Sequence, residues 1–285
     1  MRAFAYERPT SLAAAVARLA ERGPDARPLA GGTDLIIRLR DRTLQPGLVL
    51  DVKRIAELDD AIAPTDRGRV IGARTSMTAI AADPGLRADH RALTEAAAVV
   101  GSVQIRNRAT LAGNICNASP AADTAPALLV DDAVVVVTGT AGERRIPIDA
   151  FFVRSGVTTL APDELVTAIE LPRPARRRGT VHLRRTRRRG HDLASVTLAC
   201  AVSDDGLTRI AYGSLGPRPL LVIDETGVLA DPASSDDAVR DRLDALFVDA
   251  APSATSMRAG PDYRLAMLRV LGLRAVRIAT ERLAS

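Results

Sequence analysis

Apolar residues near the start of the chain recur with the period of an α-helix. Leu12, Val16 and Leu19 lie three or four positions apart, which places their side chains on one face of a helix. Ser11 or Thr10 can accept a hydrogen bond from the first turn. The same argument along the chain predicts helices over 11–22, 76–82, 93–100, 125–129, 236–248 and 262–283, and a helical turn over 34–40.

Short apolar runs rich in β-branched residues predict strands. The plainest case is residues 132–138, which contain four consecutive valines. Three segments near the C-terminus are typical of antiparallel strands, and Asp204–Gly206 fits a hairpin turn between the last two. The predicted strands are 47–52, 68–73, 132–138, 180–187, 195–203 and 207–214.

A stretch rich in proline and arginine, residues 171–179, separates two kinds of pattern. Helices and strands are mixed before it, whereas three antiparallel strands and then two helices are predicted after it. We therefore predict an α+β fold. It would consist of an N-terminal region in two lobes, residues 1–55 and 56–173, and a smaller sheet-and-helix domain, residues 174–285.

The length and composition are those of a globular protein. The 285 residues suffice for two or three packed subdomains. No apolar run reaches the roughly eighteen residues that a membrane span needs, and the first residues lack the apolar stretch of a signal peptide. Two cysteines, Cys116 and Cys200, are too few for a disulfide framework. We therefore expect a cytoplasmic chain without a membrane span.

The composition also excludes several kinds of chemistry. Lys53 is the only lysine among 39 lysine and arginine residues and lacks the glycines of a P-loop. Two cysteines cannot supply the four ligands that an iron–sulfur cluster usually takes. The histidines His90, His182 and His191 lack the spacing of metal ligands, and no Gly-x-Ser-x-Gly motif offers a hydrolase nucleophile.

Two loops rich in small residues carry the strongest functional signal. The first, Pro28–Leu35, reads Pro-Leu-Ala-Gly-Gly-Thr-Asp-Leu, and the second, Ile105–Asp123, contains Ala-Thr-Leu-Ala-Gly-Asn-Ile-Cys-Asn. Glycine lets backbone N–H groups approach a phosphate, because no Cβ stands in the way. Two such loops can bind the two phosphates of a dinucleotide, and neither fits the Gly-x-Gly-x-x-Gly pattern of the Rossmann turn.

These loops resemble those of the flavin-binding (medium) subunits of the molybdenum hydroxylases, the family of carbon monoxide dehydrogenase and xanthine dehydrogenase. The resemblance runs nearly end to end. It includes Phe4-x-Tyr6-x-x-Pro9, the helix Ser11–Ala20, Ile71-Gly72-Ala73, Asp192-x-Ala194-x-Val196 and Asp262-Tyr263-Arg264. It implies a two-lobed PCMH-type FAD-binding domain followed by a small C-terminal domain of antiparallel sheet and helices.

The resemblance implies an FAD site built from both loops and from later positions. Gly31 and Gly32 would offer backbone N–H groups to the pyrophosphate, although Gly-Gly-Thr-Asp alone would favour a plain turn. Ala112 stands where the family usually has a glycine. The implied cofactor-binding residues are Leu29, Ala30, Gly31, Gly32, Thr33, Asp34 and Leu35 in the first loop, Thr110, Gly113, Asn114, Asn117 and Asp123 in the second, and Leu165, Val166 and Arg184 later in the chain. No metal site and no catalytic residue is implied in this chain.

Several of these residues have structural alternatives. Asp123 can instead cap the helix predicted after it, and Leu165 and Val166 can simply belong to a strand core. Arg184 stands where members of the family place a lysine near the flavin ring, and a cation there would stabilise the anionic reduced flavin. Asp192 would orient Arg184 or a neighbouring loop.

Nine arginines lie between Arg173 and His191. Clustered arginines can neutralise nucleic-acid phosphates. The run lacks interleaved aromatic residues, however, and the chain has no tryptophan, so we predict no nucleic-acid partner. Contact with acidic partner subunits, binding of an anionic electron acceptor such as NAD, and a solvated basic face remain open.

The resemblance implies an electron-transfer subunit that binds FAD. Electrons would come from two [2Fe–2S] clusters on a small partner subunit, which receive them from molybdopterin on a large subunit, and would pass to NAD, oxygen or a quinone. Such subunits commonly assemble as a dimer of heterotrimers. The alternative is an autonomous flavin-dependent oxidase or dehydrogenase of the same fold, for which the sequence offers no convincing catalytic base.

Overall fold

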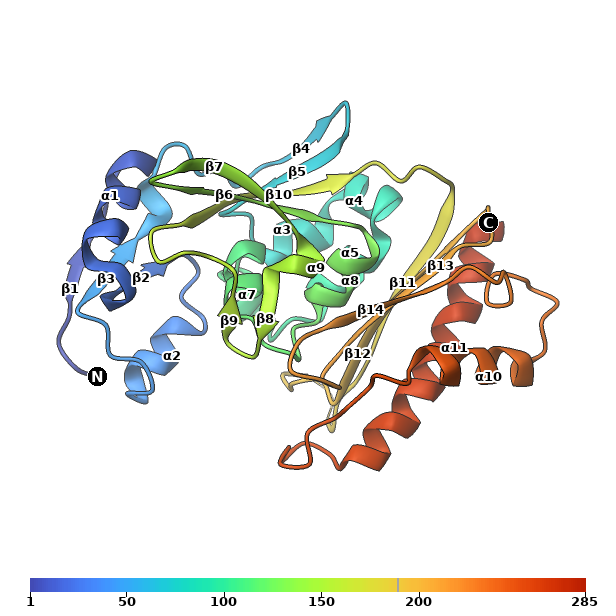
Figure 1. Cartoon of the computed structure of the whole chain (residues 1–285). Coiled ribbons are helices and arrows are strands. Elements are labelled where there is room, and N and C mark those ends of the chain that lie inside the picture. The colour runs from blue at the N-terminus through green and yellow to red at the C-terminus, as the bar shows by residue number, and fades with distance from the viewer. Residues whose placement is uncertain (189) are drawn as a thin grey trace.

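The computed structural model describes residues 1–188 and 190–285. Figure 1 shows three main sheets with their helices, arranged in chain order from one end of the molecule to the other. The first lobe is a parallel sheet of order β1-β3-β2. Its elements are β1 (Ala5–Glu7), α1 (Leu12–Arg22), β2 (Ala26–Leu29), α2 (Leu35–Arg40) and β3 (Leu48–Asp51), with 3₁₀ turns at Gly23–Asp25 and Val52–Arg54.

Helix α1 begins and ends where its sequence predicts. The hydroxyl of Ser11 accepts a hydrogen bond from the backbone N–H of Ala14 at 3.2 Å, which satisfies one of the free donors of the first turn. Three apolar residues of the helix are buried. Gly23 ends the helix with a positive φ of 53°, a conformation that glycine adopts without strain.

The second sheet is antiparallel, with the order β4-β5-β10-β6-β7. Strand β10 (Leu165–Pro172) comes last in the sequence but lies between β5 and β6. The other strands are β4 (Ile62–Thr65), β5 (Gly68–Gly72), β6 (Val134–Gly139) and β7 (Gly142–Pro147), and a separate ribbon consists of β8 (Phe152–Arg154) and β9 (Val157–Thr158). The helices of this lobe are α3 (Met77–Ala82), α4 (Pro84–Asp89), α5 (Arg91–Ala98), α6 (Val103–Arg106), α7 (Leu111–Cys116), α8 (Thr124–Val130) and α9 (Ile148–Phe151).

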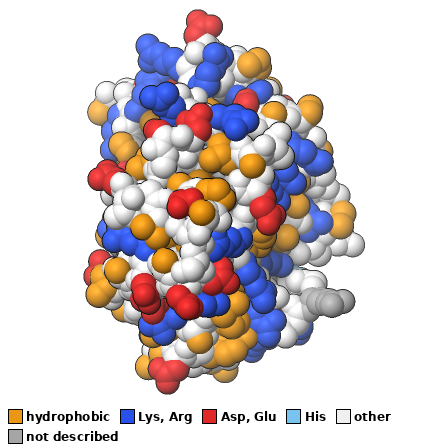
Figure 2. Space-filling view, turned by 90° about the vertical axis from the view of Figure 1, so that its right-hand side faces the viewer, with side chains coloured by type: hydrophobic (Ala, Val, Ile, Leu, Met, Phe, Trp, Pro, Cys, Tyr) orange, Lys and Arg blue, Asp and Glu red, His pale blue; other side chains and the backbone are white. Residues whose placement is uncertain are grey.

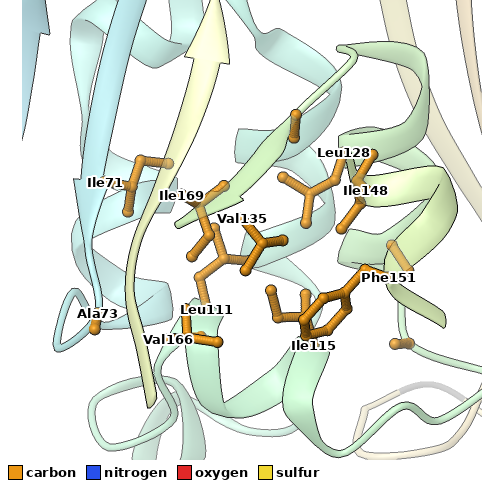
Figure 3. Close-up of a cluster of buried hydrophobic side chains, with 14 of the residues drawn as sticks. Ile71, Ala73, Leu111, Ile115, Leu128, Val135, Ile148, Phe151, Val166 and Ile169 are labelled. Carbon is orange, nitrogen blue, oxygen red and sulfur yellow. The ribbon is translucent and has the colours of Figure 1, made fainter. Parts of the chain in front are cut away.

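An apolar core lies between this sheet and the helices on one of its faces (Figure 3). Ile71, Val135 and Ile169 come from three neighbouring strands, and their side chains lie near Leu111 and Ile115 of α7. All five side chains are fully buried. Because strand side chains alternate between the two faces, only every second valine of β6 belongs to this core.

The third sheet is antiparallel, with the order β11-β12-β13-β14. Its strands are β11 (Arg178–Arg185), β12 (Val196–Ser203), β13 (Thr208–Gly213) and β14 (Leu220–Asp224), and the helices α10 (Asp236–Leu246) and α11 (Pro261–Ala284) follow. Helix α11 packs closely on β11: a Cβ on Gly179 would lie 1.9 Å from the carbonyl oxygen of Ala279. Only glycine allows this approach.

Helices cover the third sheet on both faces. Leu198 and Cys200 of β12 belong to the core that includes α11, whereas Ala199 and Ala201 belong to the core of the second lobe. Helix α8 packs on β12 and β13 from that lobe. Strand β12 is therefore buried on both sides, which explains its continuous apolar sequence.

Ion pairs join the second lobe to the third sheet and α11, and we call them the polar seam. The carboxylate of Asp131, after α8, pairs with Arg178 of β11, and its other oxygen lies 3.2 Å from Nδ1 of His90. The side chains of Asp131 and His90 are buried. A second pair joins Glu95 of α5 to Arg282 of α11 at 2.8 Å. The second lobe and the third sheet are thus held together by directed ion pairs as well as by apolar packing.

The structure confirms the predicted α+β class, and the bounds of the predicted helices and strands agree within two residues. A strand at Leu165 and Val166, the start of β10, was only an alternative. The sequence did not reveal β1, β2, β4, β7, β8, β9 and β14, nor the short helices α4, α6, α7 and α9. The division of the chain at residues 55 and 173 stays a prediction. Among the described residues, no helix combines the length and apolar character needed to cross a membrane.

Candidate cofactor site

The two glycine loops touch each other. The first follows β2 at the carboxyl end of the parallel sheet, and the second contains α7. A Cβ on Gly31 would lie 2.1 Å from the carbonyl oxygen of Arg108 and 3.0 Å from Cα of Ala109. Backbone meets backbone at this point, which only a residue without a side chain allows. Segments far apart in the sequence are therefore brought together in one place.

The first loop leaves several backbone donors unused. Within residues 1–188 and 190–285, no group accepts a hydrogen bond from the N–H of Gly31, Gly32 or Thr33. Gly32 has a φ of 76°, the left-handed conformation that turns successive N–H groups toward one side of a loop. Such a run of free donors is a suitable binding site for a phosphate group.

Thr110 organises the second loop. Its hydroxyl oxygen accepts a hydrogen bond from the backbone N–H of Gly113 at 3.0 Å and caps α7. This bond satisfies one of the free backbone donors in the first turn of the six-residue helix α7. A Cβ on Gly113 would lie 3.0 Å from the same oxygen. The structure thus places Thr110 and Gly113 together, and no described residue accepts a hydrogen bond from the Thr110 hydroxyl.

Replacement of Thr110 by alanine should lower the free energy of unfolding by about 1 kcal/mol, because the N-cap bond is lost. Thermal or urea unfolding of the whole chain measures this change. Thr110→Ser keeps the hydroxyl and should retain most of the stability. Equal losses in both variants would show that packing of the Thr110 methyl group matters rather than the cap.

A side-chain hydrogen bond also links the two loops. Nδ2 of Asn117 donates to Oδ1 of Asp34 at 3.3 Å. Burial raises the pKa of Asp34 above its ordinary value, against the opposing effect of Arg38. Asn114 instead bonds to the first residue of α8: its Oδ1 accepts a hydrogen bond from the hydroxyl of Thr124 at 2.6 Å. The amide of Asn117 therefore connects the two loops, and the amide of Asn114 connects the second loop to α8.

Asp123 connects the second loop to the third sheet. It stands at the N-cap position of α8, but its side chain makes no cap hydrogen bond, so the alternative of a side-chain cap is wrong. Its Oδ2 instead accepts a hydrogen bond from Arg184 at 2.8 Å, and its Oδ1 lies 3.6 Å from Nε2 of His182. Asp123 and Arg184 were both candidates from the sequence, and the structure pairs them.

Asp192 does not orient Arg184. Its Oδ2 accepts hydrogen bonds from the backbone N–H groups of Arg187 and Arg188 at 3.1 and 3.3 Å. Of the two roles expected for Asp192, the structure therefore confirms the one that concerns a neighbouring loop.

Comparison with known proteins gives the family. Residues 2–174 match the family described as "FAD binding domain in molybdopterin dehydrogenase", and residues 182–279 match "CO dehydrogenase flavoprotein C-terminal domain". The carbon monoxide dehydrogenase medium chain of Hydrogenophaga pseudoflava is 32% identical over 285 residues, covering 99% of this chain and 98% of that protein. The chain belongs to the FAD-binding subunits of the molybdenum hydroxylases.

Further relatives agree with this assignment. A putative xanthine dehydrogenase FAD-binding subunit of Escherichia coli (strain K12) is 30% identical over 93% of this chain and 92% of that protein. A chain in the structure of reconstituted CO dehydrogenase from Oligotropha carboxidovorans superposes with a TM-score of 0.91 at 29% identity, covering 99% of both chains. The expected fold, the FAD cofactor and the role as an oxidoreductase subunit are therefore confirmed for this flavoprotein subunit.

The residues at the loops fit FAD. Gly31 and Gly32 have backbone donors that no described residue uses, and a pyrophosphate needs such donors. Oδ1 of Asp123 is buried and has no hydrogen-bond partner among the described residues, and a buried acceptor without a donor is unfavourable. A hydroxyl group of the cofactor would supply the missing donor.

Leu165 and Val166 lie at the start of β10. Both side chains are buried in the core of the second lobe, and Figure 3 shows Val166 close to Leu111. The strand-core alternative is therefore correct for both residues. A contact of either side chain with the flavin ring stays a prediction.

Ion pairs occupy part of the arginine run at 173–191. Arg178 and Arg184 pair with Asp131 and Asp123, and Arg187 lies 3.6 Å from Asp192. One member of the run, Arg189, lies outside the described residues. On the face of the molecule in Figure 2, basic side chains alternate with acidic ones. The run is thus partly neutralised by the chain's own carboxylates, and its contact with a partner subunit stays a prediction.

Sequence reasoning missed a group of residues beside the first loop. The ammonium group of Lys53 lies 2.7 Å from Oδ1 of Asp51 and donates to the carbonyl oxygen of Ala30 at 3.4 Å. The hydroxyl of Tyr6 donates to the other oxygen of Asp51. The uniqueness of Lys53 in a chain so rich in arginine is the sequence signal that could have drawn attention to it.

Proposed function

We propose that this chain binds FAD between its two glycine loops and passes electrons from [2Fe–2S] clusters of a small partner subunit to a terminal acceptor, which is NAD, oxygen or a quinone. The observation that carries the proposal is the contact of Gly31 with Arg108, which brings the loops together beside unused backbone donors. The names of the relatives support the electron-transfer role.

In this proposal, different residues of the chain bind different parts of FAD. The backbone N–H groups of Gly31 and Gly32 and the hydroxyl of Thr33 bind the pyrophosphate, and Ala30 and Leu35 line the loop. Thr110, Gly113, Asn114 and Asn117 form the opposite side. The free oxygen of Asp123 accepts a hydrogen bond from a cofactor hydroxyl. These contacts fix the position of the cofactor, which supplies the redox chemistry when it is bound.

Arg184 sets the electrostatics beside the ring system in this proposal. Its guanidinium group is held by the carboxylate of Asp123 at 2.8 Å. Because Asp123 balances much of the positive charge, Arg184 would favour an anionic flavin mainly through N–H groups that donate to the flavin. Substitution of lysine by arginine at this position keeps the charge and adds a planar group with several donors.

The electron donors belong to other chains. The two cysteines of this chain are free, and four are usually needed for an iron–sulfur cluster. We place the clusters on a small subunit and molybdopterin on a large subunit, with a dimer of heterotrimers as the assembly. Free cysteines also agree with a reducing cytoplasm.

The first test is the visible spectrum of the purified chain, together with identification of the released cofactor. We expect flavin absorption bands and FAD rather than FMN. If the protein is colourless, reconstitution is repeated with co-expressed partner subunits. Failure to take up FAD in their presence would contradict the proposal.

A second measurement distinguishes an electron-transfer subunit from an autonomous flavin-dependent dehydrogenase. The chain alone, loaded with FAD, is mixed anaerobically with substrates of molybdenum hydroxylases. We expect no sustained bleaching of the flavin bands without the partner subunits. Substrate-driven bleaching by the chain alone would instead identify an autonomous dehydrogenase.

A further inference from the structure

The position of Lys53 follows from the register of the first sheet. Leu29 at the end of β2 pairs with Asp51 at the end of the parallel strand β3. The residues that follow, Ala30 in the first loop and Lys53 in the 3₁₀ turn, therefore leave the sheet at the same edge. This places the chain's only lysine beside the loop that we assign to the pyrophosphate.

Asp51 anchors the lysine. Its carboxylate is almost completely buried, and burial would raise its pKa, but hydrogen bonds from Lys53 and Tyr6 outweigh that effect and the pKa lies below its ordinary value. Asp51 is therefore ionised and fixed by the Tyr6 hydroxyl on its other side. The backbone N–H of Lys53 also donates to Asp51 at 3.0 Å. The lysine side chain is thus held at both ends.

The anchored ammonium group then constrains the loop. It donates to the carbonyl oxygen of Ala30 at 3.4 Å. That carbonyl and the N–H of Gly31 belong to one planar trans peptide unit, in which they point in opposite directions. Holding the carbonyl toward Lys53 therefore turns the Gly31 N–H away from Lys53. No described residue accepts a hydrogen bond from this N–H.

We propose that Lys53 is a positioning residue for FAD, which orients the Ala30–Gly31 peptide so that its N–H is presented to the pyrophosphate. This inference rests on the proposed function, because it assigns the first loop to the pyrophosphate. The positive charge of Lys53 is balanced by Asp51 at 2.7 Å, so its role lies in geometry rather than in net charge.

Three variants of the full chain test the proposal by equilibrium titration with FAD. Lys53→Met keeps the length of the side chain and removes its donors, and we expect about a tenfold loss of affinity, the size of one hydrogen bond to a charged group. Lys53→Arg keeps a donor and should restore most of the affinity. Arg54→Met removes an exposed charge from the same turn and should leave the affinity unchanged.

A chemical experiment avoids any failure of a variant to fold. Acetylation of the folded wild-type chain removes the positive charge by which Asp51 anchors Lys53, and also that of the terminal amine, whereas amidination with methyl acetimidate modifies the same groups and keeps their charge. Peptide mass mapping confirms that Lys53 has reacted completely. We expect acetylation to weaken FAD binding and amidination to preserve most of it. The acetylated Lys53→Arg chain controls for the terminal amine and should be unaffected.

The outcomes are distinct. FAD affinity that is unchanged in Lys53→Met and after complete acetylation would overturn the positioning role while leaving the proposed function intact. An equal loss in Arg54→Met, or no recovery in Lys53→Arg, would also overturn it, because the effect would not depend on a donor at position 53. A wild-type chain that takes up no FAD even with its partner subunits would refute the proposed function itself.

Discussion

Replacement of Gly31 by alanine should weaken FAD binding. The added Cβ would lie 2.1 Å from the carbonyl oxygen of Arg108, far inside van der Waals contact, and neither partner is a flexible side chain. The two loops must separate, at a cost of about 1–3 kcal/mol for such overpacking. We expect a loss of FAD affinity of about 5- to 150-fold, measured by titration of the apoprotein with FAD.

Gly260→Ala is the matched control. Gly260 has a φ of −66°, and a Cβ there would meet no atom within 4 Å. The same chemical change should therefore have little effect on FAD binding. Wild-type affinity in Gly31→Ala would show that the close contact between the loops is not needed to hold the cofactor.

Replacement of Asp131 by alanine should lower the free energy of unfolding by about 3–5 kcal/mol, because it leaves a buried partner charge without compensation. Asp131 is the centre of the polar seam, where its carboxylate meets Arg178 and His90. Its side chain is completely buried. Urea denaturation at neutral pH, monitored by circular dichroism, measures the loss.

An exposed ion pair serves as the control for Asp131. Asp244 of α10 contacts Arg269 of α11 at 2.6 Å, but both side chains are about half exposed. Exposed pairs contribute little to stability, so Asp244→Ala should unfold close to the wild-type midpoint. Similar losses in Asp131→Ala and Asp244→Ala would contradict a special role for the buried seam.

The Asp131 pair also predicts a dependence on pH. Burial would raise the pKa of Asp131, but Arg178 and His90 outweigh it and the pKa lies below its ordinary value. The stabilisation is therefore present above the pKa of the unfolded chain, about 3.9, and is lost as the pH falls through the lower folded-state pKa. The stability difference between wild type and Asp131→Ala should narrow over that range, and an unchanged difference would argue against ionisation of Asp131.

Elements with a long, regular apolar period could be predicted from the sequence, and others could not. Helix α1 has such a period, and strand β12 was recognised instead as a continuous apolar run of strand length. Strand β10 has no such period, because a β-bulge between Val166 and Ala168 interrupts the alternation of its side chains. The strands β1 and β2 have only three and four residues, too few for any period to be recognised.

Some features of the candidate site could be predicted from the local sequence, and others depend on contacts between distant segments. The glycine loops could be found because glycine marks close backbone approach within a short segment. The pairing of Asp123 with Arg184 spans 61 positions and exists only because the third sheet packs on α8. The link from Asp51 through Lys53 to Ala30 likewise depends on the parallel register of two strands. No local pattern encodes such contacts.

The strand order β4-β5-β10-β6-β7 has a consequence for synthesis of the chain on the ribosome. The hairpins β4–β5 and β6–β7 are complete before residues 165–172 emerge, yet β5 and β6 each lack their second partner strand until β10 arrives between them. Unpaired strand edges can join those of neighbouring chains, and long-range pairing forms slowly. The nascent chain therefore carries an open edge on β5 from residue 72 until β10 emerges, and premature termination in that interval leaves a fragment prone to aggregation.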